Sequence, residues 1–150
     1  MEWTKDNFKI STDKTLLNFE AVHHYLSKEC YWAKNISETK IRTACANSLC
    51  FGLYEDKKQV GLARLITDYA TFAYLCDVYV LPEYQRRGLG KWLITCVMKH
   101  PDLQTIKRWT LATKDAHGLY VQLGFTQLKN PDRHMEYRNE KVFDEVWLVE

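Results

Sequence analysis

The stretch LPEYQRRGLG, residues 81–90, decides the fold because it joins a strand-like segment to a helix-like one. Residues 71–82 are rich in aromatic and β-branched side chains, which favour a strand. From Leu89 onward, apolar residues recur every fourth position, as on one face of a helix. Gly88 and Gly90 lie at the junction, although glycine weakens a helix interior. We therefore expect a helix to begin near Gly88, directly after a strand.

The start of this helix has the chemistry of an anion site. The first N–H groups of a helix lack internal partners and carry partial positive charge, so small residues there let several amides approach a phosphate oxygen. Arg86, Arg87 and Lys91 add positive charge around the loop. The spacing matches neither the GxxxxGK[ST] phosphate loop nor the three-glycine dinucleotide fingerprint. From the residues alone, a pyrophosphate site and a tight turn with solvated arginines stay equally open.

The rest of the sequence predicts a mixed α/β fold with a mostly antiparallel sheet. Apolar residues at helical spacing predict two opening helices, at residues 16–33 and 37–48. A charged turn between the first two strand-like runs indicates an antiparallel meander. The predicted strands are residues 48–56, 58–68, 71–82, 108–113 and 125–130.

The C-terminal part continues this alternation. His100 and Pro101 are expected to end the helix that follows the two glycines. Another helix is predicted to start with Asp115 as its cap and to close at Gly124 in the left-handed conformation. The tail from His134 mixes aromatic residues with alternating charge. Three roles stay open for this tail: a final strand, a cover for a sheet edge, or the arm of a homodimer.

Length and composition bound the class of protein. The 150 residues contain no linker or repeat, so one domain over residues 1–150 is expected. A net charge of +2 leaves a small electrostatic footprint, and no nucleic-acid partner is predicted. No apolar run approaches the ~20 residues that span a membrane, and the first residues lack a signal-peptide pattern. We therefore expect a cytoplasmic protein without a membrane partner.

The cysteines and histidines do not predict a metal centre. Five cysteines form an odd set without a CxxC pair, which favours reduced, mostly buried thiols. His23 and His24 are neighbours in a predicted helix, where successive side chains point about 100° apart and do not easily share one metal.

Two motifs carry a resemblance to a known family. QRRGLG, residues 85–90, resembles the Q/R-x-x-G-x-G/A signature of the GNAT superfamily of N-acetyltransferases. LATKDAHGLYVQLGF, residues 111–125, is similar to the helix of that family with the pattern A-x-x-L-Y-x-x-L-G-F. The order and distance of the motifs also match, and the resemblance is strong over residues 49–125. It implies a GNAT-like sheet with a V-shaped splay between central strands, as in small bacterial acetyltransferases.

The resemblance implies an acetyl-CoA site at the junction. The backbone amides of residues 85–90 would hold the pyrophosphate, and the strand around Val78 and Val80 would pair with the pantetheine arm. Thr113 stands where many relatives have an asparagine that contacts this arm. The residues assigned to acetyl-CoA are Val78, Tyr79, Val80, Gln85, Arg86, Arg87, Gly88, Leu89, Gly90, Lys91 and Thr113.

The resemblance also implies direct transfer of the acetyl group to an amine. Tyr120 falls on the family's tyrosine position and would protonate the leaving thiolate. The glutamate that some relatives carry at the position of Tyr74 or Cys76 is missing here. Strand alternation places the nearest acid, Asp77, on the face opposite Cys76. The general base stays open among Asp68, Glu20, His117 and an ordered water.

The motifs do not identify the acceptor. A small primary amine, an amino acid, a polyamine and a peptide N-terminus are all compatible with a pocket that offers cation–π contacts. Because the strand glutamate is missing, an acyl-CoA-binding regulatory module without turnover stays open as the alternative. The candidates for the walls of an amine pocket are Trp3, Tyr25, Tyr31, Trp32, Asp68, Tyr69 and Phe72.

Overall fold

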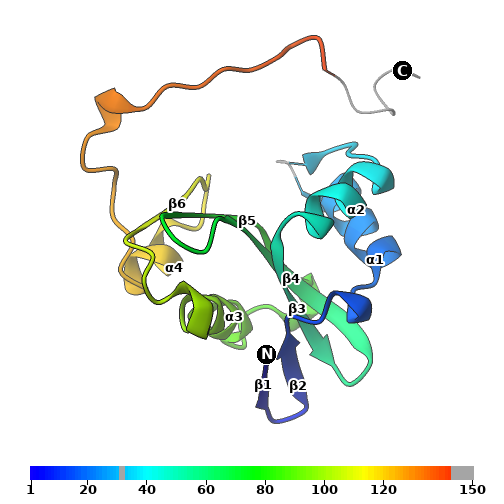
Figure 1. Ribbon diagram of the computed structural model, residues 1–150. Coiled ribbons are helices and arrows are strands. Elements are labelled where there is room, and N and C mark those ends of the chain that lie inside the picture. The colour runs from blue at the N-terminus through cyan, green and yellow to red at the C-terminus, as the bar shows by residue number, and fades with distance from the viewer. Residues whose placement is uncertain (31–32, 143–150) are drawn as a thin grey trace.

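Six strands form one sheet in the part of the chain that the computed structural model describes, residues 1–30 and 33–142 (Figure 1). Neighbouring strands are antiparallel except for the last pair, which is parallel. The strands lie in sequence order across the sheet: β1 (Glu2–Lys5), β2 (Phe8–Ser11), β3 (Leu49–Glu55), β4 (Lys58–Thr67), β5 (Phe72–Val80) and β6 (Arg108–Leu111). The predicted mixed, mostly antiparallel sheet is confirmed.

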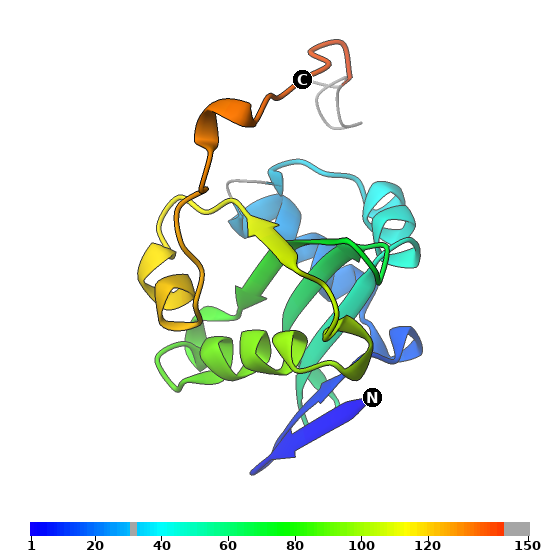
Figure 2. The same ribbon diagram turned by 60° about the vertical axis from the view of Figure 1, so that its left-hand side comes forward.

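The α-helices cover both faces of this sheet (Figures 1 and 2). Helices α1 and α2 lie on one face, and α3 and α4 lie on the other. These helices are α1 (Phe19–His24), α2 (Glu38–Ala46), α3 (Leu89–Met98) and α4 (His117–Gln122). Short 3₁₀ turns occur at Lys14–Leu16, Pro82–Tyr84, Pro101–Leu103 and Pro131–Arg133. As predicted, α3 begins directly after Gly88 and ends before His100.

Alternation along β4 divides the core into two parts. Ala63 and Leu65 belong to the buried cluster under α3 and α4. Leu62 belongs to the cluster under α1 and α2. All three side chains are fully buried. Burial on both faces explains why the central strands appear in the sequence as almost continuous apolar runs.

The chain opens with a hairpin that the sequence analysis missed. Strands β1 and β2 pair from Glu2 opposite Ser11 to Lys5 opposite Phe8. Asp6 has a φ of 55° in the turn between them, a left-handed conformation that aspartate tolerates and that tight hairpins require. The prediction that helices open the domain is therefore wrong. The signal for this hairpin is the turn-forming pair Asp6 and Asn7, which lies between two short strand-like segments.

The predicted helix over residues 16–33 is divided in the structure. Asn18 caps α1, and its side chain accepts a hydrogen bond from the N–H of Ala21 at 3.0 Å. A π-helical turn at Tyr25–Glu29 follows α1. Asparagine favours the cap over the helix interior because its side chain competes for backbone N–H groups. The predicted second helix is confirmed as α2.

The predicted strand at residues 125–130 is wrong. These residues follow α4 without regular structure, and β6 remains the last strand of the sheet within the described chain. A strand needs a neighbouring strand for its backbone groups, and no described strand is paired with residues 125–130. Residues 134–142 of the tail form no strand either. The rest of the predicted tail, residues 143–150, lies outside the described chain.

The last two strands of the sheet separate part of the way along. Strand β6 pairs with β5 from Phe72 opposite Arg108 to Leu75 opposite Leu111. Strand β5 then continues to Val80 without a neighbour on that side in the described structure. This is the predicted V-shaped splay. None of the described helices is long and apolar enough to span a membrane.

Candidate active site

A bulge interrupts β5 beside the splay. Tyr79 is paired with Leu62, and Cys76 is paired with Arg64, so β5 has one more residue than β4 between these two pairs. Asp77 lies in the bulge with a φ of 50°. A bulge of this kind bends the strand and interrupts the alternation of its side chains.

The bulge overturns the expected position of Asp77. Directly opposed residues such as Arg64 and Cys76 present their side chains on the same face of a sheet. The Nε of Arg64 donates a hydrogen bond to the Oδ2 of Asp77 at 2.8 Å, and its Nη1 donates to the Oγ of Ser48 at 2.9 Å. Asp77 therefore lies on the same face as Cys76, contrary to the prediction. Its carboxylate is engaged in a mostly buried ion pair.

The backbone of β5 offers hydrogen-bonding groups to the splay. The N–H of Leu81 donates to the carbonyl of Val60 on β4 at 2.8 Å. Because backbone groups alternate along a strand, those of the preceding Val80 point to the opposite side, away from β4. The side-chain Nε2 of Gln85 accordingly donates to the carbonyl of Val80 at 2.8 Å. Val78, next to the bulge, has no register partner on β4 or β6.

Tyr79 was assigned to acetyl-CoA together with Val78 and Val80, but it is held on the other side of β5. Its backbone is paired with Leu62 on β4. Its ring stacks on that of Tyr25, with centroids 4.2 Å apart, in the cluster under α1 and α2. The Tyr79 side chain therefore packs on the side of the sheet away from the opening, and its assignment to acetyl-CoA stays a prediction.

The predicted anion loop has the expected backbone geometry. Gly88 is the N-cap of α3 with a φ of 76°, and no side chain caps the helix there. The first intrahelical bond runs from the N–H of Trp92 to the carbonyl of Gly88 at 3.0 Å, so the preceding amides are not used within the helix. Arg86 is left-handed too, with a φ of 64°. The guanidinium of Arg87 lies over the ring of Tyr84, 5.3 Å from its centroid.

The first turn of α3 connects this loop to β5. The Leu89 side chain is buried in the core, so its backbone N–H is the part available to a ligand. A Cβ at Gly90 would lie 3.9 Å from the Cγ2 of Val80, whereas a Cβ at Gly88 would meet no atom within 4 Å. Lys91 is exposed on the same turn. The unpaired β5 backbone therefore leads directly to the uncapped start of α3.

Tyr120 lies on the same face of the sheet, on α4. Its side chain is 8% exposed, and its ring meets that of Phe125 edge-on at 5.7 Å between centroids. Within the described chain its hydroxyl forms no hydrogen bond. Burial raises the pKa of Tyr120 to about 12. Tyr120 lines a cavity of about 670 Å³ together with Thr113 and His117.

The hydroxyl of Thr113, which was predicted to contact the pantetheine arm, forms a hydrogen bond within the chain. Its hydroxyl accepts a hydrogen bond from the N–H of Ala116 at 3.1 Å, just before α4. Ala116, and not Asp115, is the N-cap residue, and no side chain caps the first turn of α4. The predicted Asp115 cap is wrong. Gly124 closes the helix with a φ of 96°, as predicted.

The candidate bases lie in different places. Asp68 organises the turn between β4 and β5 by accepting hydrogen bonds from Thr71 and from the N–H groups of neighbouring residues. The side-chain and backbone bonds from Thr71 hold the pKa of Asp68 well below its usual range, which makes it a weak base. Glu20 is on α1, on the other face of the sheet. Of the sequence candidates, His117 lines the cavity that contains Tyr120.

The candidate wall residues do not form one pocket. Trp3 packs on Phe51 and His100 beside β1, with centroids 6.0 and 6.3 Å away. Phe72 lies at the start of β5 under the guanidinium of Arg108. The remaining candidates are spread over two elements or fall outside the described residues: Tyr25 is in the π-helical turn, Asp68 and Tyr69 are in the β4–β5 turn, and Tyr31 and Trp32 are not described.

Comparisons with known proteins agree with this arrangement. The profile of the Acetyltransferase (GNAT) family matches residues 19–125. A GNAT-family protein from Xanthomonas campestris pv. campestris, known from a crystal structure, is 48% identical, with a TM-score of 0.87 over 91% of this chain and 96% of that chain. The protein "Uncharacterized N-acetyltransferase ycf52" of Pyropia yezoensis is 31% identical over 150 residues, or 86% of this chain and 85% of the relative.

Other relatives are longer than this chain. A Gibberella zeae protein that is provisionally named an acetyltransferase is 38% identical over 111 residues. That match covers 61% of this chain and 63% of the relative. The "GCN5-related N-acetyltransferase 2, chloroplastic" of Arabidopsis thaliana is 38% identical over 72 residues, which are 47% of this chain and 28% of that protein. The chain thus spans less than two thirds of the length of these relatives.

Proposed function

Because this chain belongs to the Acetyltransferase (GNAT) family, we propose that it is an enzyme that transfers the acetyl group of acetyl-CoA directly to a primary amine. The observation that carries the proposal is the continuity of two features. The unpaired backbone at Val78 leads into the uncapped N-terminus of α3 at Gly88. Such a path suits a long ligand that has peptide-like groups along one part and a pyrophosphate at its end.

Different groups of the chain bind different parts of this ligand. The amides of residues 86–90 hold the pyrophosphate, since that of Gln85 already donates to the carbonyl of Pro82 at 3.2 Å, and Arg86, Arg87 and Lys91 add positive charge around it. The backbone of Val78, which has no register partner on β4 or β6, binds the pantetheine arm, and its N–H steadies the carbonyl oxygen as negative charge develops there. Acetyl-CoA supplies the thioester that the amine attacks.

Tyr120 provides the proton for the leaving sulfur. Its phenol is neutral over the physiological range because burial raises its pKa to about 12. The same burial destabilises a thiolate in the cavity, which keeps the basicities of the two groups close. We assign the role of general acid to the Tyr120 hydroxyl. His117, which lines the same cavity, or a water held there removes the proton from the amine.

Release of free thiol from acetyl-CoA tests this function. The full chain is incubated with acetyl-CoA and a panel of small primary amines, amino acids, polyamines and peptides with free N-termini. We expect thiol release that depends on one class of amine. Acetyl-CoA binding without release on any amine, in a panel that extends to protein substrates, would favour the alternative of a regulatory acyl-CoA-binding module.

Acetyl-CoA is expected to stabilise the fold because it binds the native state. At a ligand concentration of 100 times Kd, the free energy of unfolding should rise by about 2.7 kcal/mol. For a chain of this size this corresponds to an increase in Tm of roughly 5–10 °C. Differential scanning fluorimetry with acetyl-CoA, and with a neutral amide of pantetheine as control, measures the effect. An unchanged Tm at millimolar acetyl-CoA would remove the proposed cofactor.

The proposal also covers the chain as a whole. We propose that residues 1–150 form one domain, since helices from both halves of the chain cover the same sheet. All five cysteines are free thiols, which supports the proposed cytoplasmic location, where thiols stay reduced.

A further inference from the structure

An ion pair crosses the bulge in β5 on the face of the sheet that α1 and α2 cover. Arg64 on β4 is paired with Cys50 on β3, and Cys50 is buried in the cluster under these two helices. The Nε of Arg64 donates to the Oδ2 of Asp77 at 2.8 Å, and the two side chains are each 15% exposed. We call this contact the bulge pair, since it ties β4 to the bulged residue of β5.

A chain of hydrogen bonds anchors the bulge pair to α2. The Nη1 of Arg64 donates to the Oγ of Ser48 at 2.9 Å. That hydroxyl donates to the carbonyl of Ala44 in α2 at 2.7 Å. A guanidinium is planar and rigid, and its N–H groups donate in fixed directions. Because two of these directions are occupied, Arg64 holds the Asp77 carboxylate at a fixed place relative to β4 and α2.

The conformation of Asp77 requires support from its surroundings. Its φ of 50° is uncommon for a residue other than glycine, and such residues persist only where the surrounding structure determines their conformation. A mostly buried ion pair adds little net stability, since both charges lose hydration, but it can specify which segments lie side by side. If the bulge moved along β5, the carboxylate would leave Arg64, whose mostly buried charge would lose its partner. The bulge pair therefore favours one position of the bulge.

We propose that the bulge pair fixes the position of the bulge in β5, and that Arg64 and Asp77 are thereby positioning residues for acetyl transfer. This inference rests on the proposed function, in which the backbone of Val78 binds the pantetheine arm and its N–H steadies the oxyanion. Val78 directly follows Asp77 and has no register partner on β4 or β6. A bulge that shifted by one residue would move Val78 along the ladder with β4 and turn its N–H away from the ligand. Arg64 and Asp77 thus act on the ligand through this backbone.

A double variant separates positioning from stability. Arg64→Met/Asp77→Asn removes both charges together, so neither stays buried without the other, and the Tm should change little. Asparagine accepts the left-handed conformation as readily as aspartate does, so the local preference for a bulge is kept. What the variant lacks is the tie between β5 and β4. Arg64→Lys keeps the charge but not the rigid fork that reaches both Asp77 and Ser48, and it should show intermediate effects.

Hydrogen–deuterium exchange of the full chain reports on the bulge without acetyl transfer. In the double variant the amides of residues 76–80 should exchange at least about tenfold faster than in the wild type, because the bulge is no longer fixed. Residues 73–75 are paired with both β4 and β6, and their exchange should stay the same. Mass spectrometry of peptic fragments distinguishes the two segments.

Kinetics on an accepted amine and calorimetry measure the functional effect. At saturating acetyl-CoA the kcat of the double variant should be about 10²- to 10³-fold lower than that of the wild type, as after the loss of one donor to an oxyanion. Arg64→Lys should recover part of this loss. The Kd for acetyl-CoA should rise by about three- to tenfold, as for the loss of one hydrogen bond.

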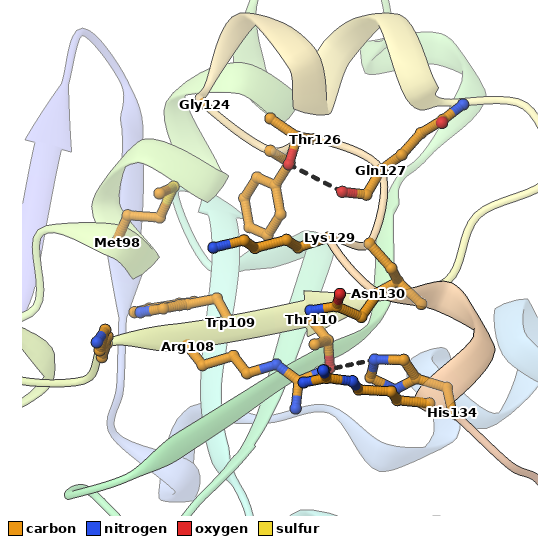
Figure 3. A pocket seen from close by; sticks show the side chains of 14 residues that line it. Met98, Arg108, Trp109, Thr110, Gly124, Thr126, Gln127, Lys129, Asn130 and His134 are labelled. Atoms are coloured by element: carbon orange, nitrogen blue, oxygen red, sulfur yellow. Dashed lines mark hydrogen bonds between the residues drawn. The ribbon is translucent and has the colours of Figure 1, made fainter.

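Arg108→Met is the matched control, since Arg108 is an arginine on β6, the other neighbour of β5. Its guanidinium donates a hydrogen bond to the Nε2 of His134 at 3.1 Å, and Figure 3 shows these two side chains next to each other. The substitution removes an arginine and its bond to a distant segment but does not touch the bulge. The kcat, the Kd for acetyl-CoA and the exchange of residues 76–80 should stay those of the wild type.

Three results would overturn the proposal. Wild-type exchange of residues 76–80 in the double variant would show that the bulge keeps its position without the pair. Faster exchange with the kcat and Kd of the wild type would show that the position of the bulge does not matter for transfer. A fall in kcat that follows a fall in Tm, and that is recovered at lower temperature, would give the pair a structural role alone.

Failure of the proposed function has a different signature. A wild type that releases no thiol on any amine would contradict acetyl transfer itself. The exchange data and the Kd for acetyl-CoA would then still decide whether the bulge pair positions the backbone that binds this ligand.

Discussion

Replacing Tyr120 by phenylalanine should lower kcat by about 10²- to 10⁴-fold on an accepted amine, the range typical for loss of a general acid. The substitution removes the hydroxyl and keeps the ring, which packs edge-on against Phe125. Because the hydroxyl forms no hydrogen bond within the described chain, its loss leaves no partner unsatisfied. The Tm and the affinity for acetyl-CoA should therefore change little. Steady-state kinetics and fluorimetry on the same preparations measure both effects.

Tyr54 provides the matched control for this substitution. Its hydroxyl is buried without a hydrogen-bond partner in the described structure, but it lies on β3, far along the sheet from β6. Tyr54→Phe also removes the hydroxyl of a buried phenol and should keep kcat unchanged. A Tyr120→Phe variant with the kcat of the wild type, on an amine whose chemical step limits turnover, would rule out the phenol as the proton donor.

The pH dependence gives a second readout on Tyr120. Burial raises the pKa of Tyr120 to about 12. The phenol therefore remains almost fully protonated, and able to donate, at about pH 10, where an ordinary tyrosine would be half deprotonated. The wild-type kcat should therefore show no decline from Tyr120 below that pH. A fall in kcat near pH 9 that disappears in Tyr120→Phe would contradict the assigned environment.

Replacing Gly88 by valine should raise the Kd for acetyl-CoA at least about tenfold. Gly88 has a φ of 76°, which a β-branched residue resists, so the loop must change its backbone conformation. Hydrogen bonds to a charged group contribute about 1.5–3 kcal/mol each, so the loss of even one amide contact to the pyrophosphate is enough for this effect. Isothermal titration calorimetry measures the affinity directly, and the stabilisation of Tm by acetyl-CoA should decrease with it.

Gly124→Val is the control for the effect of backbone strain alone. Gly124 has a φ of 96°, and a Cβ there would meet no atom within 4 Å, as at Gly88. The two substitutions therefore impose similar backbone strain, of order 1–3 kcal/mol. Gly124→Val should lower the Tm and keep the affinity for acetyl-CoA. If both variants lose affinity equally, the loop at residues 85–90 is not the specific site of the pyrophosphate.

The sequence by itself determined the features that depend on local chemistry. A strand followed by glycines and an apolar period of four residues predicts α3 and its start, because glycine at Gly88 permits the left-handed N-cap that the helix uses. The same reasoning predicts the left-handed Gly124. Short motifs with fixed spacing also carried the family resemblance. In each case the determining residues are neighbours in the chain.

Tertiary structure alone decided the features that depend on strand pairing. The bulge at Asp77 appears when β5 is aligned with β4, and it moves the carboxylate to the face of Cys76, where Arg64 binds it. Likewise, the splay exists because β6 ends its pairing at Leu75 of β5. Residues 125–130 have the composition of a strand but lack a partner. Side-chain alternation is a local property of a chain, whereas register and partners are set by segments distant in sequence, which is why these positions could not be predicted from the residues.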